Sequence, residues 1–356
     1  MNIGESMKTG KREGVHPAAW PVMALVLLGT TVLCVGVGSV PIAPGDTVRA
    51  VWNAMRGLPA PEGIAGPIIL SVRLPRVLCA GLMGAALSLC GAAMQGLFRN
   101  PLADGGTLGV SSGGALGAAL AIVLNITIPG IPLAGNVTMA MIFSFGSMMM
   151  ILAMAWGMDR SLSTYTVILI GVVFSMLASA LLSLLIAFAG DKVKSITFWT
   201  MGSLSGRNMT HVLILTIGLA VFGGMLLFRS RELNHFALGE ENARRVGVPV
   251  RRVKLAILIA ASALIGTCVA VGGSVAFVGL IIPHMVRMVT GPNHRKVMPV
   301  SLFAGAVFLM LTDLLARTVI APVELPIGVV TSLIGALTFA AIFRSSRKGG
   351  KRRAGI

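Results

Sequence analysis

Long apolar runs separated by short polar segments dominate the chain, and about twenty consecutive apolar residues are enough to cross a bilayer as a helix. Eight runs have about that length, and they lie roughly at residues 20–40, 74–97, 106–128, 134–157, 163–189, 211–228, 299–317 and 326–343. The pattern therefore predicts a protein built from membrane-spanning helices.

A further apolar run, from Leu255 to Thr290, is too long for a single crossing. As one helix it would measure about 54 Å at 1.5 Å per residue, well beyond the ~30 Å hydrocarbon core. Gly272 and Gly273 lie near its middle, where a helix breaks easily. We therefore expect two helices, 254–272 and a short 275–290, and an all-α polytopic fold of about ten transmembrane helices with both termini on one side.

Composition supports this interpretation and excludes a soluble globular protein. Of the 356 residues, 55% are hydrophobic and 12% are charged, with a mean hydropathy of +0.89, whereas a soluble domain carries about 25% charged residues. The net charge of +17 is unevenly distributed: 21 of the 29 Lys and Arg fall on the side of the termini and 8 on the other. The richer side is expected to be cytoplasmic, so the charge predicts no nucleic-acid partner.

Two alternatives to this topology are disfavoured. A re-entrant segment after Gly273 would move the last nine basic residues outside, against the charge asymmetry. The first apolar run follows Lys8, Lys11 and Arg12 like a signal peptide, but it is long enough to span and lacks a clear small-x-small cleavage site. The predicted organisation is a cytoplasmic tail at 1–18, one ten-helix membrane domain at 19–344 and a basic cytoplasmic tail at 345–356.

The chain carries neither a Walker A nor an HExxH sequence. Its cysteines fall inside apolar runs without metal-ligand spacing, as small buried hydrophobes do: Cys34, Cys79, Cys90 and Cys268. His284 is better explained by a structural hydrogen bond than by haem or metal ligation. We therefore predict no catalytic residue, no metal site and no cofactor bound by this chain, so active transport would draw energy from a partner or an ion gradient.

The longest cytoplasmic loop, 229–252, contains a bounded helical pattern. Glu240 and Glu241 precede Arg244 and Arg245 at i, i+4 spacing, which favours a short exposed helix. Gly247 supplies a C-terminal stop. Two interpretations remain open: a solvated connector, or a rigid knob presented to a cytoplasmic partner.

Charged groups also occur near the predicted outer helix ends. Asp313 and Arg317 are four residues apart, and a local ion pair is favoured over a proton relay. Arg73 and Arg76 begin the second span, where snorkelling is the simple explanation. Together the three arginines could also form a positive patch for an acidic partner.

Small residues recur at Gly109, Gly113 and Gly117, four positions apart. Such spacing is typical of close helix packing in membranes. Lining of a pore by these positions is the alternative, which spacing cannot exclude.

Eight short motifs occur along the chain at 73–76 (RLPR), 91–104 (GAAMQGLFRNPLAD), 108–113 (LGVSSG), 199–205 (WTMGSLS), 238–247, 277–284 (FVGLIIPH), 294–295 (HR) and 324–331 (ELPIGVVT). In sequence and in order they resemble the FecCD-like permease family, the transmembrane subunits of type II ABC importers for iron–siderophore complexes, haem or cobalamin.

The resemblance implies ten helices per subunit, two permease subunits (identical or related) around a central path, two cytoplasmic ATPase subunits that use ATP and Mg, and an extracytoplasmic binding protein. It places the chain in a bacterial cytoplasmic (inner) membrane. It also assigns ATPase coupling to the region 235–248, with the residues His235, Leu238, Gly239, Glu240, Glu241, Ala243, Arg244, Arg245 and Gly247.

Further roles follow from the same resemblance. Docking of the binding protein is assigned to Arg73, Arg76 and Arg317. The cytoplasmic gate is assigned to Asn100, Pro101, Leu102, Ser161, Ser163 and Thr164.

The sequence departs from the family pattern at four turn or kink positions. Gly105 and Leu337 stand where the family usually has proline, while Ser274 and Ala276 replace a common proline and glycine. These departures bear on the geometry of the gate.

The leading functional hypothesis is the permease subunit of an ATP-driven importer of an iron chelate, with ferric siderophore as the first candidate. Haem and cobalamin import are the alternatives within the family. An ion-coupled secondary transporter that uses Asp313 as a proton carrier, or a channel-like scaffold, are the alternatives from other classes.

Overall fold

The computed structural model describes residues 14–38, 40–58, 65–127 and 134–353. These residues form helices and loops and contain no β-strand. The helices are α1 (Ala19–Gly36), α2 (Pro44–Met55), α3 (Ala65–Pro67), α4 (Leu74–Phe98), α5 (Val110–Val123), α6 (Ala134–Met158), α7 (Thr164–Ala187), α8 (Val193–Thr200), α9 (Met209–Gly218), α10 (Gly224–Phe228), α11 (Ser230–Ala237), α12 (Glu240–Arg245), α13 (Val250–Gly272), α14 (Val278–Thr290), α15 (His294–Thr318) and α16 (Ile327–Arg353).

The predicted polytopic fold is confirmed. Seven helical stretches are long and apolar enough to cross a membrane, and α5, α14 and the apolar part of α16 are shorter apolar helices. Together they account for all ten predicted spans. A π-helical turn, Ile68–Arg73, joins α3 to α4 in one stretch, and another, Leu219–Gly223, joins α9 to α10.

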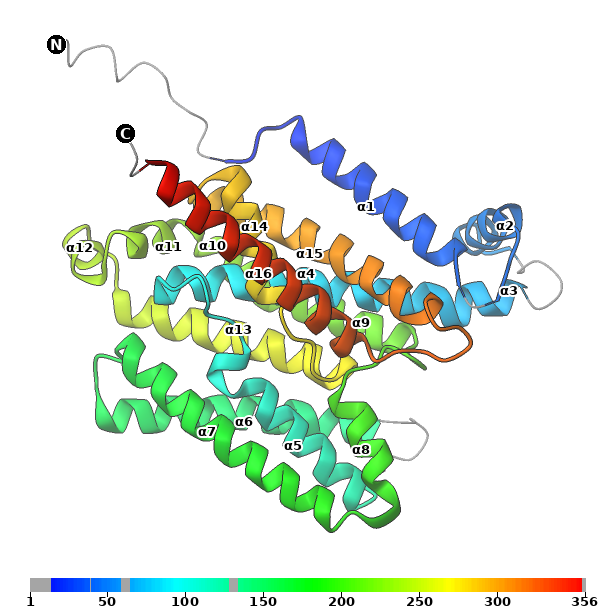
Figure 1. Ribbon diagram of the computed structural model, residues 1–356, viewed down its shortest axis with the longest axis horizontal. Helices are drawn as coiled ribbons and strands as arrows, with labels where there is room; N and C mark the ends of the chain where they lie inside the picture. The colour runs from blue at the N-terminus through cyan, green and yellow to red at the C-terminus, as the bar shows by residue number, and fades with distance from the viewer. Residues whose placement is uncertain (1–13, 39, 59–64, 128–133, 354–356) are drawn as a thin grey trace.

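The predicted break of the long apolar run is also confirmed. Helix α13 ends at Gly272, and Gly273 has φ +73°, a conformation that favours glycine. A Cβ at Gly273 would in addition overlap the carbonyl oxygen of Trp199. The chain therefore turns back here, and α14 begins at Val278 as a short second helix (Figure 1).

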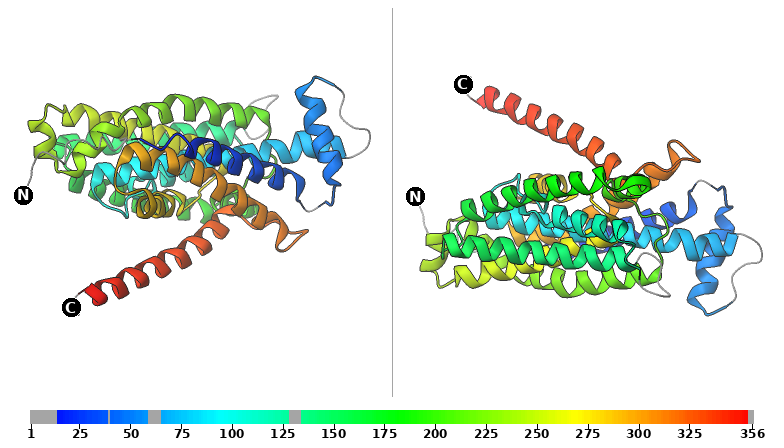
Figure 2. Two further views of the ribbon diagram at one scale, coloured as in Figure 1. Left: turned by 90° about the horizontal axis from the view of Figure 1, so that it is seen from above. Right: turned by 90° about the horizontal axis from the view of Figure 1, so that it is seen from below.

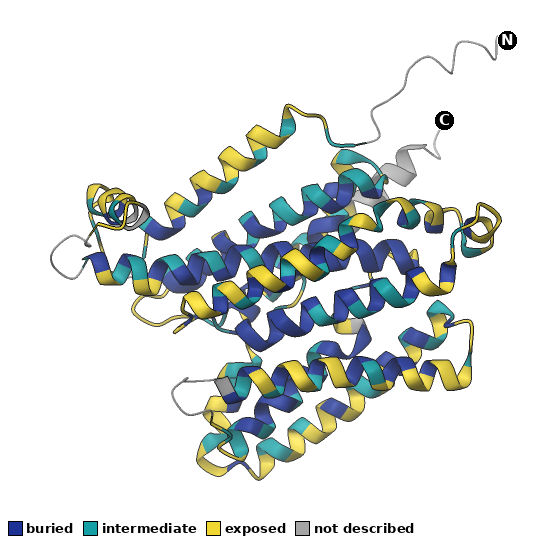
Figure 3. Cartoon of the chain, turned by 180° about the vertical axis from the view of Figure 1, so that it is seen from behind, coloured by how far each residue is buried: buried dark blue, intermediate teal, exposed yellow. Residues whose placement is uncertain are grey.

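The core of the bundle lies around α4 and α13. In their most apolar windows 89% and 78% of residues are buried, against 17% for α1 and 22% for α7 (Figure 3). Glycine allows the central backbones to approach: a Cβ at Gly91 would overlap the carbonyl oxygen of Gly279, and one at Gly84 that of Gly305. This close approach is how helices associate tightly in lipid.

The glycines of the third span pack against neighbouring helices, as predicted. A Cβ at Gly113 would lie 2.6 Å from Oγ of Ser147 on α6, and one at Gly117 would lie 2.6 Å from Cβ of Phe143. Gly109 has φ +72° and faces Phe174 on α7. All three positions therefore serve helix packing.

The two ends of the bundle differ. One end carries α11, α12 and the C-terminal part of α16, and we call it the basic end; the other carries α2 and α3, and we call it the outer end (Figure 1). Helix α16 diverges from the bundle as it runs toward the basic end (Figure 2). Its apolar side chains Leu333 and Leu337 are exposed.

Candidate functional sites

The predicted knob is present at the basic end as two short helices, α11 and α12. Leu233, Phe236 and Ala243 are buried and hold the pair against the bundle. Gly239, with φ +103°, forms the turn between the helices, and Gly247, with φ +87°, follows the second, so both positions favour glycine. The exposed surface of the knob includes the side chains of His235, Leu238, Glu241, Arg244 and Arg245.

Polar contacts join the knob to the start of α15. Asn234 donates from Nδ2 to Oδ1 of Asn293 at 2.8 Å. Its own Oδ1 accepts the backbone N–H of His294 at 2.7 Å and lies 3.0 Å from Nδ1 of that ring. The knob is thus fixed to a membrane-spanning helix by directional bonds.

Lys254 connects the knob to a second predicted site, and sequence reasoning did not identify it. This buried side chain lies one turn into α13, where its Nζ is 2.6 Å from Glu240 of α12 and donates at 3.0 Å to the carbonyl of Leu162. Leu162 belongs to the turn that precedes α7. The sequence does show a lysine in the first turns of an apolar helix, but it does not show which residues contact that lysine, because Leu162 is remote from it in the chain.

The predicted gate residues lie in two separate turns at the basic end. In the first, Oδ1 of Asn100 accepts the backbone N–H of Leu102 at 2.9 Å, and Leu102 is exposed. In the second, Ser163 caps α7 by accepting the N–H of Thr166 at 3.2 Å, with Thr164 as the first helical residue. Of the two turns, the second is linked to the knob through Lys254.

Asp159 organises the second gate turn. Its carboxylate accepts the hydroxyl of Ser161 at 2.8 Å, the backbone N–H of Ser161 at 2.8 Å and that of Ser163 at 3.0 Å. The Ser161 hydroxyl, followed by these two amides, holds the pKa of Asp159 well below its usual range. The charged form is therefore the one that holds the turn.

Asp159→Asn is expected to loosen this turn, because the amide cannot reproduce all three acceptor contacts. The pKa of Asp159 is lower in the folded protein than in the unfolded chain, so its contribution to stability is fully present above the unfolded pKa of about 3.9. That contribution is lost as the pH falls through the folded-state pKa. At neutral pH, hydrogen exchange of residues 159–166 should be faster in the variant than in the wild type. Equal exchange would contradict the assignment; residues 209–218, which form α9, serve as the internal reference.

An ion cluster, buried except for Glu324, lies at the outer end. Nε of Arg76 is 3.0 Å from Asp313, and its Nη1 is 2.8 Å from Glu324. Nε of Arg317 lies 3.5 Å from Asp313. The predicted pair of Asp313 and Arg317 is therefore confirmed, but Arg76 and Glu324 make it a cluster of four, which we call the outer ion cluster.

The three arginines predicted to dock a binding protein point into the chain. Arg73 donates to the carbonyls of Val35, Gly36 and Val40. Arg317 donates to the carbonyl of Cys34, and Arg76 is held by the two carboxylates. Their exposed fractions are only 4% for Arg73, 7% for Arg76 and 4% for Arg317. In this conformation the guanidinium groups stabilise the outer end, and docking stays a prediction.

The departures from the family pattern fall in two places. Gly105 has φ −65°, a value that proline also adopts, but a Cβ here would lie 2.6 Å from Cδ1 of Ile265, so a proline would require that side chain to shift. Ser274, Ala276 and Leu337 line one cavity of about 590 Å³ between α8, α14 and α16. Tertiary structure thus gathers three of the four departures beside the diverging helix.

No group of three or more His, Cys, Asp or Glu within the described part of the chain is arranged to hold a metal ion. The four cysteines are free and buried.

Known proteins resemble the chain along nearly all of its length. The FecCD transport family profile matches residues 25–345. An uncharacterized ABC transporter permease protein, YvrB of Bacillus subtilis, is 40% identical over 94% of this chain and 95% of its own. The molybdate import permease MolB of Haemophilus influenzae is 34% identical (92% and 96% covered), and the hemin transport permease HmuU of Yersinia pestis is 37% identical (84% and 88% covered).

A solved structure agrees in fold. An inward-facing conformation of a putative metal-chelate type ABC transporter has a TM-score of 0.81 and 33% identity, and the match covers 93% of this chain and all of the other. The ten spans and the match across both sequence and structure lead to one conclusion. The chain is a multi-pass membrane protein that belongs to the FecCD transport family of ABC importer permeases.

Proposed function

We propose that this permease moves an iron chelate, with ferric siderophore as the first candidate, across a bacterial cytoplasmic membrane by alternating access. The observation that carries the mechanism is the chain of contacts from Glu240 in the knob through Lys254 to Leu162 in the gate turn. A push on α12 from a cytoplasmic partner is thereby transmitted to the start of α7. ATP binding and hydrolysis on separate subunits would supply that push, since conformational work needs a ligand with different affinity for the two states.

The proposed partners are a second permease subunit, two ATPase subunits and an extracytoplasmic binding protein. The exposed apolar side of α16 and the cavity beneath it favour a second permease subunit as a neighbour. The knob presents charged and apolar groups of the kind an ATPase surface can engage. For the binding protein, its carboxylates would compete with Asp313 and Glu324 for Arg76 and Arg317, so docking and opening of the outer ion cluster are coupled.

Substrate choice is the finer part of the proposal. Relatives are named for molybdate, hemin and vitamin B12, and haem or cobalamin import remain the alternatives to an iron chelate. A secondary transporter is the alternative from another class. It is disfavoured because the carboxylate oxygens of Asp313 are engaged by Arg76 and Arg317, so the side chain is held by fixed partners inside the chain, whereas a proton carrier must exchange partners during transport.

The test is stimulation of ATP hydrolysis by a loaded binding protein in the reconstituted transporter. We expect a ferric-siderophore-loaded protein to raise the rate severalfold, and an ATPase-inactive complex to import none. Hemin, cobalamin and molybdate are the matched comparison ligands. Stimulation by one of these alone would replace the substrate, and uptake without ATPase subunits would overturn the mechanism.

A further inference from the structure

A second cavity, of about 390 Å³, opens at the basic end beside Pro101 of the first gate turn and His294 at the knob contact, and no role described above assigns it a ligand. It lies between the C-terminal end of α4, helix α14, the start of α15 and Ala237 of α11. Among its described lining residues there is no carboxylate, while two carry a guanidinium, Arg99 and Arg287, and two carry an imidazole, His284 and His294. Its electrostatic field therefore favours an anion.

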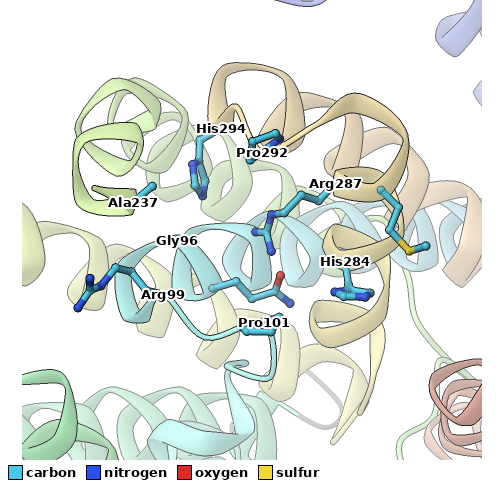
Figure 4. Close-up of a pocket in the computed structure, with 10 residues that line it drawn as sticks. Gly96, Arg99, Pro101, Ala237, His284, Arg287, Pro292 and His294 are labelled. Atoms are coloured by element: carbon cyan, nitrogen blue, oxygen red, sulfur yellow. The ribbon is translucent and has the colours of Figure 1, made fainter. Parts of the chain in front are cut away.

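Arg287 contributes a positive charge to this cavity, and it has no ion-pair or hydrogen-bond partner among the described residues. The structure gives its half-buried guanidinium neither an ion pair nor a hydrogen bond within the described residues. Two carboxylates of the knob are engaged elsewhere: Glu232 pairs with Arg229 at 2.9 Å and Glu240 with Lys254 at 2.6 Å. Arg287, His284 and His294 border the same opening, whereas Arg99 points away from them (Figure 4).

His294 contributes an unpartnered nitrogen. The side chain is 3% exposed, and its Nδ1 lies 3.0 Å from Oδ1 of Asn234. Nδ2 of Asn234 donates to Asn293, which fixes the orientation of the Asn234 amide and leaves its Oδ1 facing His294. Because Oδ1 can only accept, Nδ1 of His294 is the donor and carries a proton. Its Nε2 is buried and has no hydrogen-bond partner, which is uncommon for a buried polar atom.

Gln95 contributes a second unpartnered atom. It is 2% exposed, and its Nε2 donates to the carbonyls of Leu280 at 2.9 Å and Gly279 at 3.4 Å. These bonds fix the orientation of the amide and leave Oε1 buried without a donor. The side chains that line the cavity thus include a guanidinium without a partner among the described residues and two buried acceptor atoms without a donor, Oε1 of Gln95 and Nε2 of His294.

We propose that this cavity is a binding site for a phosphate-type oxyanion that also carries hydroxyl groups. The anionic oxygens of such a ligand can accept hydrogen bonds from the guanidinium of Arg287, a group whose geometry matches phosphate oxygens. The hydroxyls suit the free acceptors of Gln95 and His294. Two sources share this chemistry: free hydrogen phosphate, and the headgroup of an anionic lipid such as phosphatidylglycerol, whose glycerol supplies the hydroxyls.

The position gives such a ligand a consequence for the fold. The cavity is lined by the C-terminal end of α4, by Pro101 of the first gate turn, by helix α14 and by Ala237 of α11 in the knob. An anion here would add a further bridge between elements that Asn234 joins to α15 and Gln95 joins to α14. Binding is therefore expected to stabilise this arrangement of the basic end.

The experiment measures thermal unfolding of the purified, detergent-solubilised protein with inorganic phosphate against chloride of equal ionic strength. A parallel series uses nanodiscs of phosphatidylglycerol mixed with phosphatidylcholine against phosphatidylcholine alone. The test variants are Arg287→Gln and, as a second probe of the cavity, His284→Gln. Arg231→Gln, an exposed arginine on α11 outside the cavity, is the matched control.

The expected result is a rise in melting temperature of about 2–4 °C in one series, retained in Arg231→Gln and reduced by at least half in Arg287→Gln and His284→Gln. A rise confined to phosphate identifies the free anion, and one confined to phosphatidylglycerol identifies the lipid. The proposal is overturned if neither ligand raises the wild-type melting temperature, or if the rise persists in both cavity variants. Because transport is not measured, failure here leaves the proposed import function untouched.

Discussion

Replacing Asp313 by Asn is expected to lower the free energy of unfolding by about 3–5 kcal/mol, since removing one member of a buried ion pair leaves the others uncompensated. Asp313 is 1% exposed and lies between Arg76 and Arg317. In the variant only Glu324 would remain to balance two buried guanidinium groups. The melting temperature in detergent is the measurement.

The matched control is Glu241→Gln. Glu241 also pairs with an arginine at i, i+4 spacing, but both side chains are largely exposed, and such a pair contributes less than about 1 kcal/mol. An Asp313→Asn variant that melts like the wild type would contradict the structural role.

The same variant separates the two transport classes. Below its melting temperature, Asp313→Asn should still import if Asp313 only holds the outer end together. A proton carrier predicts the opposite, with uptake lost and stability intact. The pair of measurements therefore distinguishes an ion cluster that supports the fold from a group that moves protons.

Replacing Lys254 by Met is expected to uncouple the knob from the gate turn. The substitution keeps most of the aliphatic stem and removes the ammonium, so the contacts to Glu240 and to the carbonyl of Leu162 are lost. Hydrogen bonds to charged groups contribute about 1.5–3 kcal/mol. If about 1.4 kcal/mol of this interaction energy couples movement of the knob to the gate turn, its loss should lower the amount of substrate moved per ATP hydrolysed about tenfold.

Transport and ATP hydrolysis measured together in proteoliposomes test this expectation. Arg252→Met is the control, because Arg252 lies two residues earlier on the same helix with an exposed side chain. Equal transport per ATP in the wild type and Lys254→Met would show that the contact is merely structural. A fall in both variants would point to a general loss of charge at the basic end.

The spans were predictable because the bilayer imposes a length and an apolar composition on every crossing. All ten predicted runs are helices, and Gly272–Gly273 divides the longest one where expected. Helix ends were less predictable. The third span begins at Val110 rather than at 106, because Gly109 adopts a positive φ and starts the helix there.

The partners of charged groups were mostly beyond sequence reasoning. The pair of Asp313 and Arg317 was predictable, because one helical turn brings residues four apart together. The bond from Arg76 to Asp313 joins residues separated by 237 positions, and nothing in the local pattern selects it. The docking prediction treated the arginines as an outward patch, whereas the fold places them inside with carboxylate and carbonyl partners.

The sequence by itself determined the membrane environment, the number and order of the helices, the position of the knob and the family, because these depend on local composition and short motifs. Tertiary structure alone decided which polar groups meet. It joined Lys254 to Glu240 and Leu162, and it gathered Ser274, Ala276 and Leu337 around one cavity. It placed Arg287 at another cavity, where no described residue is its ion-pair or hydrogen-bond partner. The physical reason is that a buried charge must find its partner in space, and the packing of remote helices, not their order in the chain, determines which partner is near.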